Sequence, residues 1–218
     1  MSAALRIAIG ASIFAILAIV DLRRHGRAAR RWREYACLLA VTVMAMAYGA
    51  INDQITSRIS WEYFYYGKEL DKILGPQTPP DPAALHWQAM KVGLAATWSV
   101  GLLMGVALLM ANNPSRRFPQ LSACQLLSSL AIALSTTVSL AAVLGWAGWH
   151  GYLDWMSSDF SQMETTGLFR PQHFLCTFGV HLGGYLGGAI GTVLAVIWVR
   201  WRRKKLAQPC EPMRYNLT

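Results

Sequence analysis

Five long apolar stretches constrain the fold of this chain more than any other feature of its sequence. A membrane-spanning helix needs about 20 mostly apolar residues, because each residue rises about 1.5 Å through a hydrocarbon core of about 30 Å. The composition agrees, since 54% of the residues are hydrophobic and only 14% are charged. We therefore expect an all-α integral membrane protein, a bundle of about five transmembrane helices at about 3–20, 35–55, 88–110, 121–146 and 174–199.

Basic residues gather at three places: the loop after the first span, the loop between the third and fourth spans, and the C-terminal tail. These segments hold most of the 20 Lys and Arg residues and few acidic ones, which is the pattern of cytoplasmic loops. With five spans, the pattern places the N-terminus outside and the C-terminus in the cytoplasm. We expect residues 1–205 to form a single transmembrane domain and residues 206–218 a cytoplasmic tail.

This basic face predicts anionic lipid headgroups as partners. A net charge of +9 also raises nucleic acid as a partner, but the basic residues lack the interleaved aromatic residues of a stacking platform. We therefore expect no nucleic-acid binding. The basic residues of the face are Arg23, Arg24, Arg27, Arg30, Arg31, Arg33, Arg116, Arg117, Arg200, Arg202, Arg203, Lys204, Lys205 and Arg214.

The first apolar stretch can also be interpreted as a secretory signal peptide, with Arg6 as its charged start and residues 7–20 as its apolar region. Two features oppose that interpretation. No small-residue cleavage site follows, and the dense positive charge comes after the apolar run, where it resists translocation. We therefore predict a retained span.

The segment after the second span has the pattern of a helix that lies on the membrane surface. Ile55, Ile59, Tyr63 and Tyr66 recur at helical spacing, with charged residues on another face. The prolines that follow Gly75 forbid a regular helix beyond that point. We predict an interfacial helix that leaves the bilayer after the second span and ends near Gly75.

The fifth span carries a polar ladder within its apolar sequence. Thr177, His181 and Tyr185 stand at i, i+4 and i+8, so they share one face of a helix. An ionisable residue inside a membrane costs several kcal/mol unless it is paired, which makes His181 a candidate functional residue. A neutral histidine hydrogen-bonded within the bundle is the alternative, and the sequence does not decide between them.

Glycines at small-xxx-small spacing predict close helix packing next to this ladder. Gly183, Gly187 and Gly191 lie in one row of the fifth span, and Gly101 with Gly105 has the same spacing in the third span. The two rows could face each other within the chain. We also expect a protein partner or a homo-oligomer to use them.

Acidic and histidine residues near the predicted outer face are numerous enough for a transition-metal site. The catalytic candidates are Asp53, Glu62, His181 and Tyr185. No HxxxH, HExxH or ExxH spacing brings two ligands onto one helix turn, so the sequence names neither a metal nor another cofactor. The candidate metal ligands are Asp53, Glu62, His181, His86, His150 and His173.

The run 48–64, which reads YGAINDQITSRISWEYF, resembles a pattern of uncharacterised small multi-pass proteins of the bacterial inner membrane. In that pattern a Tyr-Gly pair precedes Asp-Gln-Ile-Thr and then Glu-Tyr-Phe. The resemblance continues through Thr97, Trp98, Gly101 and the segment 181–185, and it implies an inner-membrane location without a known activity. Asn52 stands where the family often has histidine, which removes a metal ligand at that position.

Three classes of function fit these features. The first is a non-catalytic accessory or assembly subunit of a larger membrane complex, favoured by small size and by glycines suited to helix packing. The second is a membrane-embedded enzyme or redox protein that handles a metal or protons near the outer face. The third is a channel or carrier protomer, which would need an oligomer to enclose its pathway.

Overall fold

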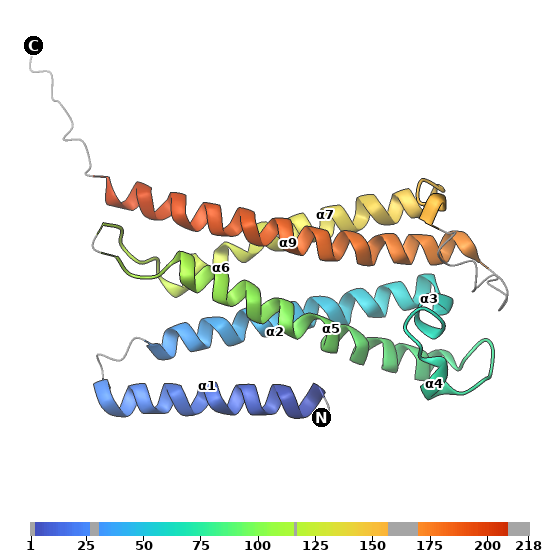
Figure 1. Cartoon of the computed structure of the whole chain (residues 1–218), viewed down its shortest axis with the longest axis horizontal. Helices are drawn as coiled ribbons and strands as arrows, with labels where there is room; N and C mark the ends of the chain where they lie inside the picture. The colour runs from blue at the N-terminus through green and yellow to red at the C-terminus, as the bar shows by residue number, and fades with distance from the viewer. Residues whose placement is uncertain (1–2, 27–30, 116, 157–169, 209–218) are drawn as a thin grey trace, which may run out of the picture.

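The computed structural model describes residues 3–26, 31–115, 117–156 and 170–208, and the regular structure among them is helical (Figure 1). Arg27, Arg30, Arg116 and the last ten residues of the predicted tail lie outside these ranges. The helices are α1 (Ala3–His25), α2 (Arg31–Ile59), α3 (Trp61–Tyr65), α4 (Asp71–Leu74), α5 (Pro82–Ala111), α6 (Ala123–Ser128), α7 (Leu130–Trp149) and α9 (Pro171–Ala207).

Four predicted spans are confirmed as helices that are long and apolar enough to cross a bilayer: α2, α5, α6 together with α7, and α9. The chain is therefore a multi-pass membrane protein. The first predicted span forms α1, a helix of 23 residues, and its crossing of the membrane stays a prediction. Most helix ends run past the predicted bounds, although the fourth span begins slightly later than predicted, at Ala123, and α9 extends through its basic end to Ala207.

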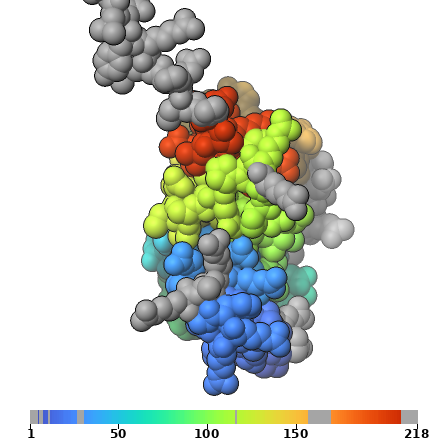
Figure 2. Space-filling view, turned by 90° about the vertical axis from the view of Figure 1, so that its left-hand side faces the viewer, coloured from blue at the N-terminus to red at the C-terminus, as the bar shows by residue number. Residues whose placement is uncertain are grey.

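The long helices form two antiparallel pairs, α2 with α5 and α7 with α9, and contacts between the pairs are far fewer than contacts within them (Figure 1). The helix α1 lies beside α2, on the side away from α7 and α9. Figure 2 shows the same order from one end, with α1 at one extreme and α9 at the other. The pairs are thus the structural units of the bundle.

Glycines of α9 explain its close contact with α7. A methyl group on Gly183 would collide with the carbonyl oxygen of Leu140, and one on Gly191 would come within 2.7 Å of the Ala133 Cα. Gly187 meets the backbone of Thr137 in the same way. The predicted row is therefore an interface inside the chain, filled by α7.

Small residues also join α2 to α5, and here the expected pairing differs. Gly101 and Gly105 do not face the glycines of α9. A Cβ on Gly101 would lie 2.7 Å from that of Ala45, and one on Gly105 would lie 2.5 Å from a methyl carbon of Leu38, both on α2. Farther along the same pair Gly49 and Gly93 face each other, and a Cβ on either one would collide with the backbone of the other. Both glycine rows predicted for a partner or a second copy thus lie within the chain's own helix pairs.

Two clusters of buried side chains join the pairs at opposite ends of the bundle. We call one end the basic end, because α1, α5 and α9 finish there with the basic residues Arg23, Arg24, Arg117, Arg200, Arg202, Arg203, Lys204 and Lys205. Its cluster combines Cys37, Val41, Leu108, Ala111, Leu121, Leu126, Leu130, Ala195 and Val199. The other, here the aromatic end, has a cluster of Tyr63, Phe64, Leu70, Leu85, Ala89 and Phe174.

At the basic end, buried polar side chains form hydrogen bonds with the backbone at the α1–α2 and α5–α6 connections. The Arg203 guanidinium is buried and donates to the carbonyl oxygens of Ala111, Asn113, Phe118 and Pro119 at 2.6–3.1 Å. Asp21 of α1 accepts from the backbone N–H groups of Arg31 and Trp32, at 3.0 and 3.3 Å, and so caps α2. These contacts hold α1 and the α5–α6 connection against the bundle.

The prediction of a single interfacial helix after the second span is wrong, because the structure has two short helices, α3 and α4, in this segment. The helix α2 ends at Ile59, and Ser60 caps a new short helix, α3, by accepting a hydrogen bond from the Tyr63 N–H at 3.2 Å. The chain then folds back, so that Tyr63, Phe64 and Tyr65 are buried against α5 and α9. The aromatic side chains close the end of the bundle, and the last helix of this segment, α4, ends at Leu74, next to the boundary predicted near Gly75.

Candidate functional site

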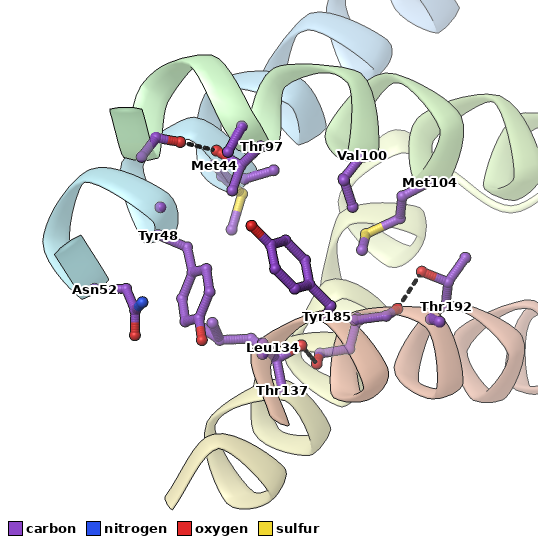
Figure 3. A pocket seen from close by; sticks show the side chains of 18 of the residues that line it. Met44, Tyr48, Asn52, Thr97, Val100, Met104, Leu134, Thr137, Tyr185 and Thr192 are labelled. Atoms are coloured by element: carbon purple, nitrogen blue, oxygen red, sulfur yellow. Dashed lines mark hydrogen bonds between the residues drawn. The ribbon is translucent and has the colours of Figure 1, made fainter. Parts of the chain in front are cut away.

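A cavity of about 610 Å³ separates the two helix pairs between the clusters of the basic and aromatic ends (Figure 3). Helices α2, α5, α7 and α9 all contribute to its wall. Its volume falls in the range of small-molecule sites, about 300–1,000 Å³. The cavity is therefore the candidate functional site.

The half of the cavity toward the basic end is apolar. Val41, Leu103, Met104, Ala107 and Leu130 line it, from α2, α5 and α7. Leu103 is 70% exposed and Leu134, which lines the same cavity, is 46% exposed. Because wall residues are also open to the outside of the bundle, the cavity opens sideways, where lipid surrounds a membrane protein.

The half toward the aromatic end is polar. Tyr48, Asn52 and Asp53 enter it from α2, His181 and Tyr185 enter it from α9, and Lys68 lines it from the connection after α3. The polar ladder of the fifth span thus faces α2. The cavity is therefore polar at one end and apolar at the other, which matches a long molecule with a polar head and an apolar tail.

Two tyrosines reach across the gap between the helix pairs in opposite directions (Figure 3). The Tyr48 ring extends from α2 toward α7 and α9, where its hydroxyl would lie 3.3 Å from a Cβ added to Gly184. The Tyr185 ring extends from α9 toward Thr97. In the part of the chain that the structure describes, neither hydroxyl has a hydrogen-bond partner, although both open into the cavity.

The threonines of the wall are satisfied within their own helices. Thr97 donates to the carbonyl oxygen of Gly93, Thr137 to Ala133 and Thr192 to Gly188, all at 2.7–2.8 Å (Figure 3). This back-bonding is the usual state of hydroxyls in membrane helices. By contrast, the hydroxyls of Tyr48 and Tyr185 have no such partner among the described residues.

An acid and a histidine are buried side by side at the polar end. The Nε2 of His181 lies 3.8 Å from Asp53 Oδ1 and 3.2 Å from Thr56 Oγ1. Both side chains are at most 8% exposed. The Thr177 hydroxyl donates to the Thr56 carbonyl oxygen at 3.5 Å, which aligns the two polar ladders. Hydrogen bonds between α2 and α9 therefore hold Asp53 and His181 next to each other.

Aromatic residues of α3 enclose the histidine. The Tyr63 ring stacks on His181 at 4.7 Å between centroids, and Phe64 meets it edge-on at 5.7 Å. Burial, together with Tyr185 and Asp53, raises the pKa of the Tyr63 hydroxyl, so this ring stays neutral. The folded-back segment therefore positions the imidazole and covers it from the aromatic end.

The other predicted ligands lie elsewhere and are bound by other groups. Glu62 is buried in α3, and its Oε1 accepts from the Arg170 backbone N–H at 3.1 Å. The Nδ1 atoms of His86, His150 and His173 lie 2.9 Å from Ser57 Oγ, the Trp146 carbonyl and the Ile59 carbonyl, respectively. Among the described residues, no three His, Cys, Asp or Glu side chains gather closely enough to hold a metal ion. The structure joins Asp53 with His181 and brings Tyr185 to the same cavity.

Sequence reasoning named Asp53 of α2 as a candidate, but it missed the polar ladder that α2 contributes to this site. Tyr48, Asn52 and Thr56 stand at i, i+4 and i+8, the same spacing as Thr177, His181 and Tyr185 on α9. Two ladders of equal period in two spans are a signal that the helices face each other. Lys68 carried no such signal, because only the fold-back after Ser60 brings it to the cavity.

Comparisons with known proteins found no family model, curated protein or solved structure that matches this chain. The resemblance of the run 48–64 to small bacterial membrane proteins stays a prediction. The geometry of the cavity is therefore the basis for a functional proposal.

Proposed function

We propose that this protein holds one amphipathic, lipid-class molecule between its two helix pairs, as a non-catalytic accessory subunit of a larger membrane complex. The cavity of about 610 Å³, apolar toward one end and polar toward the other, carries this proposal. Leaving an apolar space of this size empty is unfavourable, because its lining loses the packing contacts that a filled interior provides. A molecule from the bilayer is the nearest occupant.

The lateral opening supports entry from the membrane. Leu103, Leu134 and Tyr185 line the cavity and are still 46–70% exposed. A lipid tail can pass between the helix pairs there without crossing water. The close backbone contacts at the glycines join α2 to α5 and α7 to α9, while contacts between the two pairs are far fewer, so the gap can persist while the pairs stay closed.

The orientation in the bilayer is part of the proposal. We place the basic end in the cytoplasm of a bacterial inner membrane, against anionic headgroups, with the N-terminus outside. The Lys205 ammonium lies 4.1 Å from the centroid of Trp201, which pairs a basic and an aromatic anchor at that end. Ile9, Ile13 and Ile16 of α1 are 44–59% exposed, which supports α1 as a fifth span in lipid.

A protein partner or a second copy belongs to the accessory role. Gly183, Gly187, Gly191, Gly101 and Gly105 are used within the chain, so a partner would contact other surfaces. We infer the accessory class from the binding cavity. The lipid-binding claim can be tested without knowing the partner.

Filling the cavity tests the proposal. A Cβ on Gly188 has open space around it, with Thr137 Oγ1 at 3.9 Å, so a leucine there projects into the cavity. We expect native mass spectrometry in mild detergent to show wild-type protein with one retained lipid and Gly188→Leu with at least a tenfold lower bound fraction. Gly10→Leu is the control, because nothing lies within 4 Å of that position on α1. Equal lipid retention by all three proteins would refute the proposal.

A second candidate function is proton handling, which the buried Asp53–His181 contact supports. A carboxyl and an imidazole 3.8 Å apart can exchange a proton through a small movement or a water. Infrared difference spectroscopy in proteoliposomes, with an imposed pH gradient, tests this function. It predicts a carboxyl band that disappears in Asp53→Asn, and a spectrum unaltered by that substitution would exclude it.

A further inference from the structure

The hydrogen-bonding groups of the cavity indicate what kind of head the bound molecule carries. Tyr48 and Tyr185 supply hydroxyls that have no partner among the described residues. A polar group in an apolar surrounding costs free energy unless it is hydrogen-bonded. A ligand that offers acceptor oxygens to these hydroxyls removes that cost, whereas a plain hydrocarbon leaves it in place.

The positions of the two tyrosines along their helices argue for an uncharged head. Tyr185 lies about 20 Å along the axis of α9 from Pro171, and Tyr48 about 16 Å along α2 from Ile59. Both distances place the hydroxyls deep in the apolar stretches of the spans. A charged headgroup at such depth costs several kcal/mol, while a neutral carbonyl or hydroxyl group costs far less.

The charges that line the cavity agree with this conclusion. Lys68 and Asp53 carry opposite formal charges at the polar end, and Asn52, Tyr48 and Tyr185, which line the same cavity, are neutral. The wall thus offers no excess of either sign to an anionic or a cationic head. The two tyrosines come from opposite helix pairs, so their hydroxyls reach the cavity from two sides (Figure 3).

We infer that the cavity selects an uncharged lipid whose head carries acceptor oxygens, with the hydroxyls of Tyr48 and Tyr185 as its specificity-determining donors. This inference rests on the proposed function. The tail lies in the apolar half, toward Leu103, Met104 and Leu130. Two kinds of lipid have this chemistry: a prenylated quinone, with ring carbonyls, and a diacylglycerol, with ester carbonyls and a hydroxyl.

Binding to protein in nanodiscs tests the inference. The probes are a prenylated benzoquinone, a diacylglycerol, a fatty acid and phosphatidylglycerol, each titrated and detected by native mass spectrometry. We expect one of the two neutral lipids to bind at least tenfold more tightly than either charged lipid. The neutral lipid with the lower Kd identifies the natural source of the head.

Removing single hydroxyls then tests the assigned residues. A neutral hydrogen bond contributes about 0.5–1.5 kcal/mol, so Tyr48→Phe and Tyr185→Phe should each weaken that binding by about three- to tenfold. Tyr35→Phe is the matched control, because this tyrosine of α2 packs on Phe14 away from the cavity. All three variants keep the aromatic ring, so their melting temperatures should stay near that of the wild type.

The outcomes separate this inference from the proposed function. Tighter binding of a charged lipid, or equal affinity in both cavity tyrosine variants and Tyr35→Phe, would overturn the uncharged-head assignment. If Gly188→Leu still lost the bound lipid, the lipid-binding function would survive that result. If Gly188→Leu retained lipid like the wild type, both the function and the inference would fail.

Discussion

Arg203 illustrates how single polar residues hold this bundle together at the residue scale. Its guanidinium donates to four backbone carbonyls, including that of Ala111 at the end of α5, where the helix dipole favours a positive charge. The charge run of the tail predicted an interfacial, lipid-facing role for all of these basic residues. Burial of Arg203 shows that one of them is a structural tie instead.

Replacing Arg203 with alanine should destabilise the protein. The carbonyls it serves would lose charge-assisted hydrogen bonds, at a cost of about 2–4 kcal/mol. We expect a clear drop in melting temperature in detergent for Arg203→Ala and almost none for Lys204→Ala, its exposed neighbour. Equal melting temperatures of Arg203→Ala and Lys204→Ala would contradict a structural role for the Arg203 hydrogen bonds.

The Asp53–His181 contact shows what sequence could and could not predict about the site. A histidine inside one apolar span and an acid near the end of another are visible as anomalies, and the structure brings these two together. Glu62 looked equally suitable, but Ser60 ends the helix before it and turns its carboxylate toward the Arg170 backbone. Ser60 is a residue type that favours helix N-caps, so it was a weak signal in the sequence for the break.

At the scale of elements, hydropathy predicts which segments span, and small residues predict that helices pack closely. Neither hydropathy nor small-residue spacing predicts which helix packs against which. Gly101 has the same spacing as Gly183, yet one packs on α2 and the other on α7. The choice depends on the whole set of side chains around each glycine, which a single spacing does not contain.

Leucine substitutions should distinguish glycines that pack helices from a glycine that lines the cavity. At Gly183 the new side chain meets the α7 backbone, with Ala141 Cα 2.7 Å from the Cβ position, so we expect a loss of about 1–3 kcal/mol of stability. At Gly188 the space is open, and the better helix propensity of leucine should keep the melting temperature at or above that of the wild type.

Thermal unfolding followed by tryptophan fluorescence in detergent measures both effects under the same conditions. Gly183→Ala adds a smaller side chain and should fall between the wild type and Gly183→Leu. Equal stability of Gly183→Leu and Gly188→Leu would contradict the assignment of α7 and α9 as a tightly packed pair.

For the whole molecule, the central feature is a bundle closed at both ends and open in the middle. The cluster around Leu108 and Val199 joins the pairs at the basic end, and the cluster around Phe64 and Phe174 joins them at the aromatic end. Sequence could not predict the space between them, since it results from where side chains are missing rather than from a motif. The same space gives the protein its proposed function.

The most direct test of this account is an experimental structure in a lipid bilayer, determined for wild type and for Gly188→Leu. We predict elongated density of one lipid between the helix pairs in the wild type, with its head between Tyr48 and Tyr185 and its tail toward Met104, and no such density in the variant. A wild-type structure in which the two pairs close onto each other, leaving no space beside Gly188, would contradict the account.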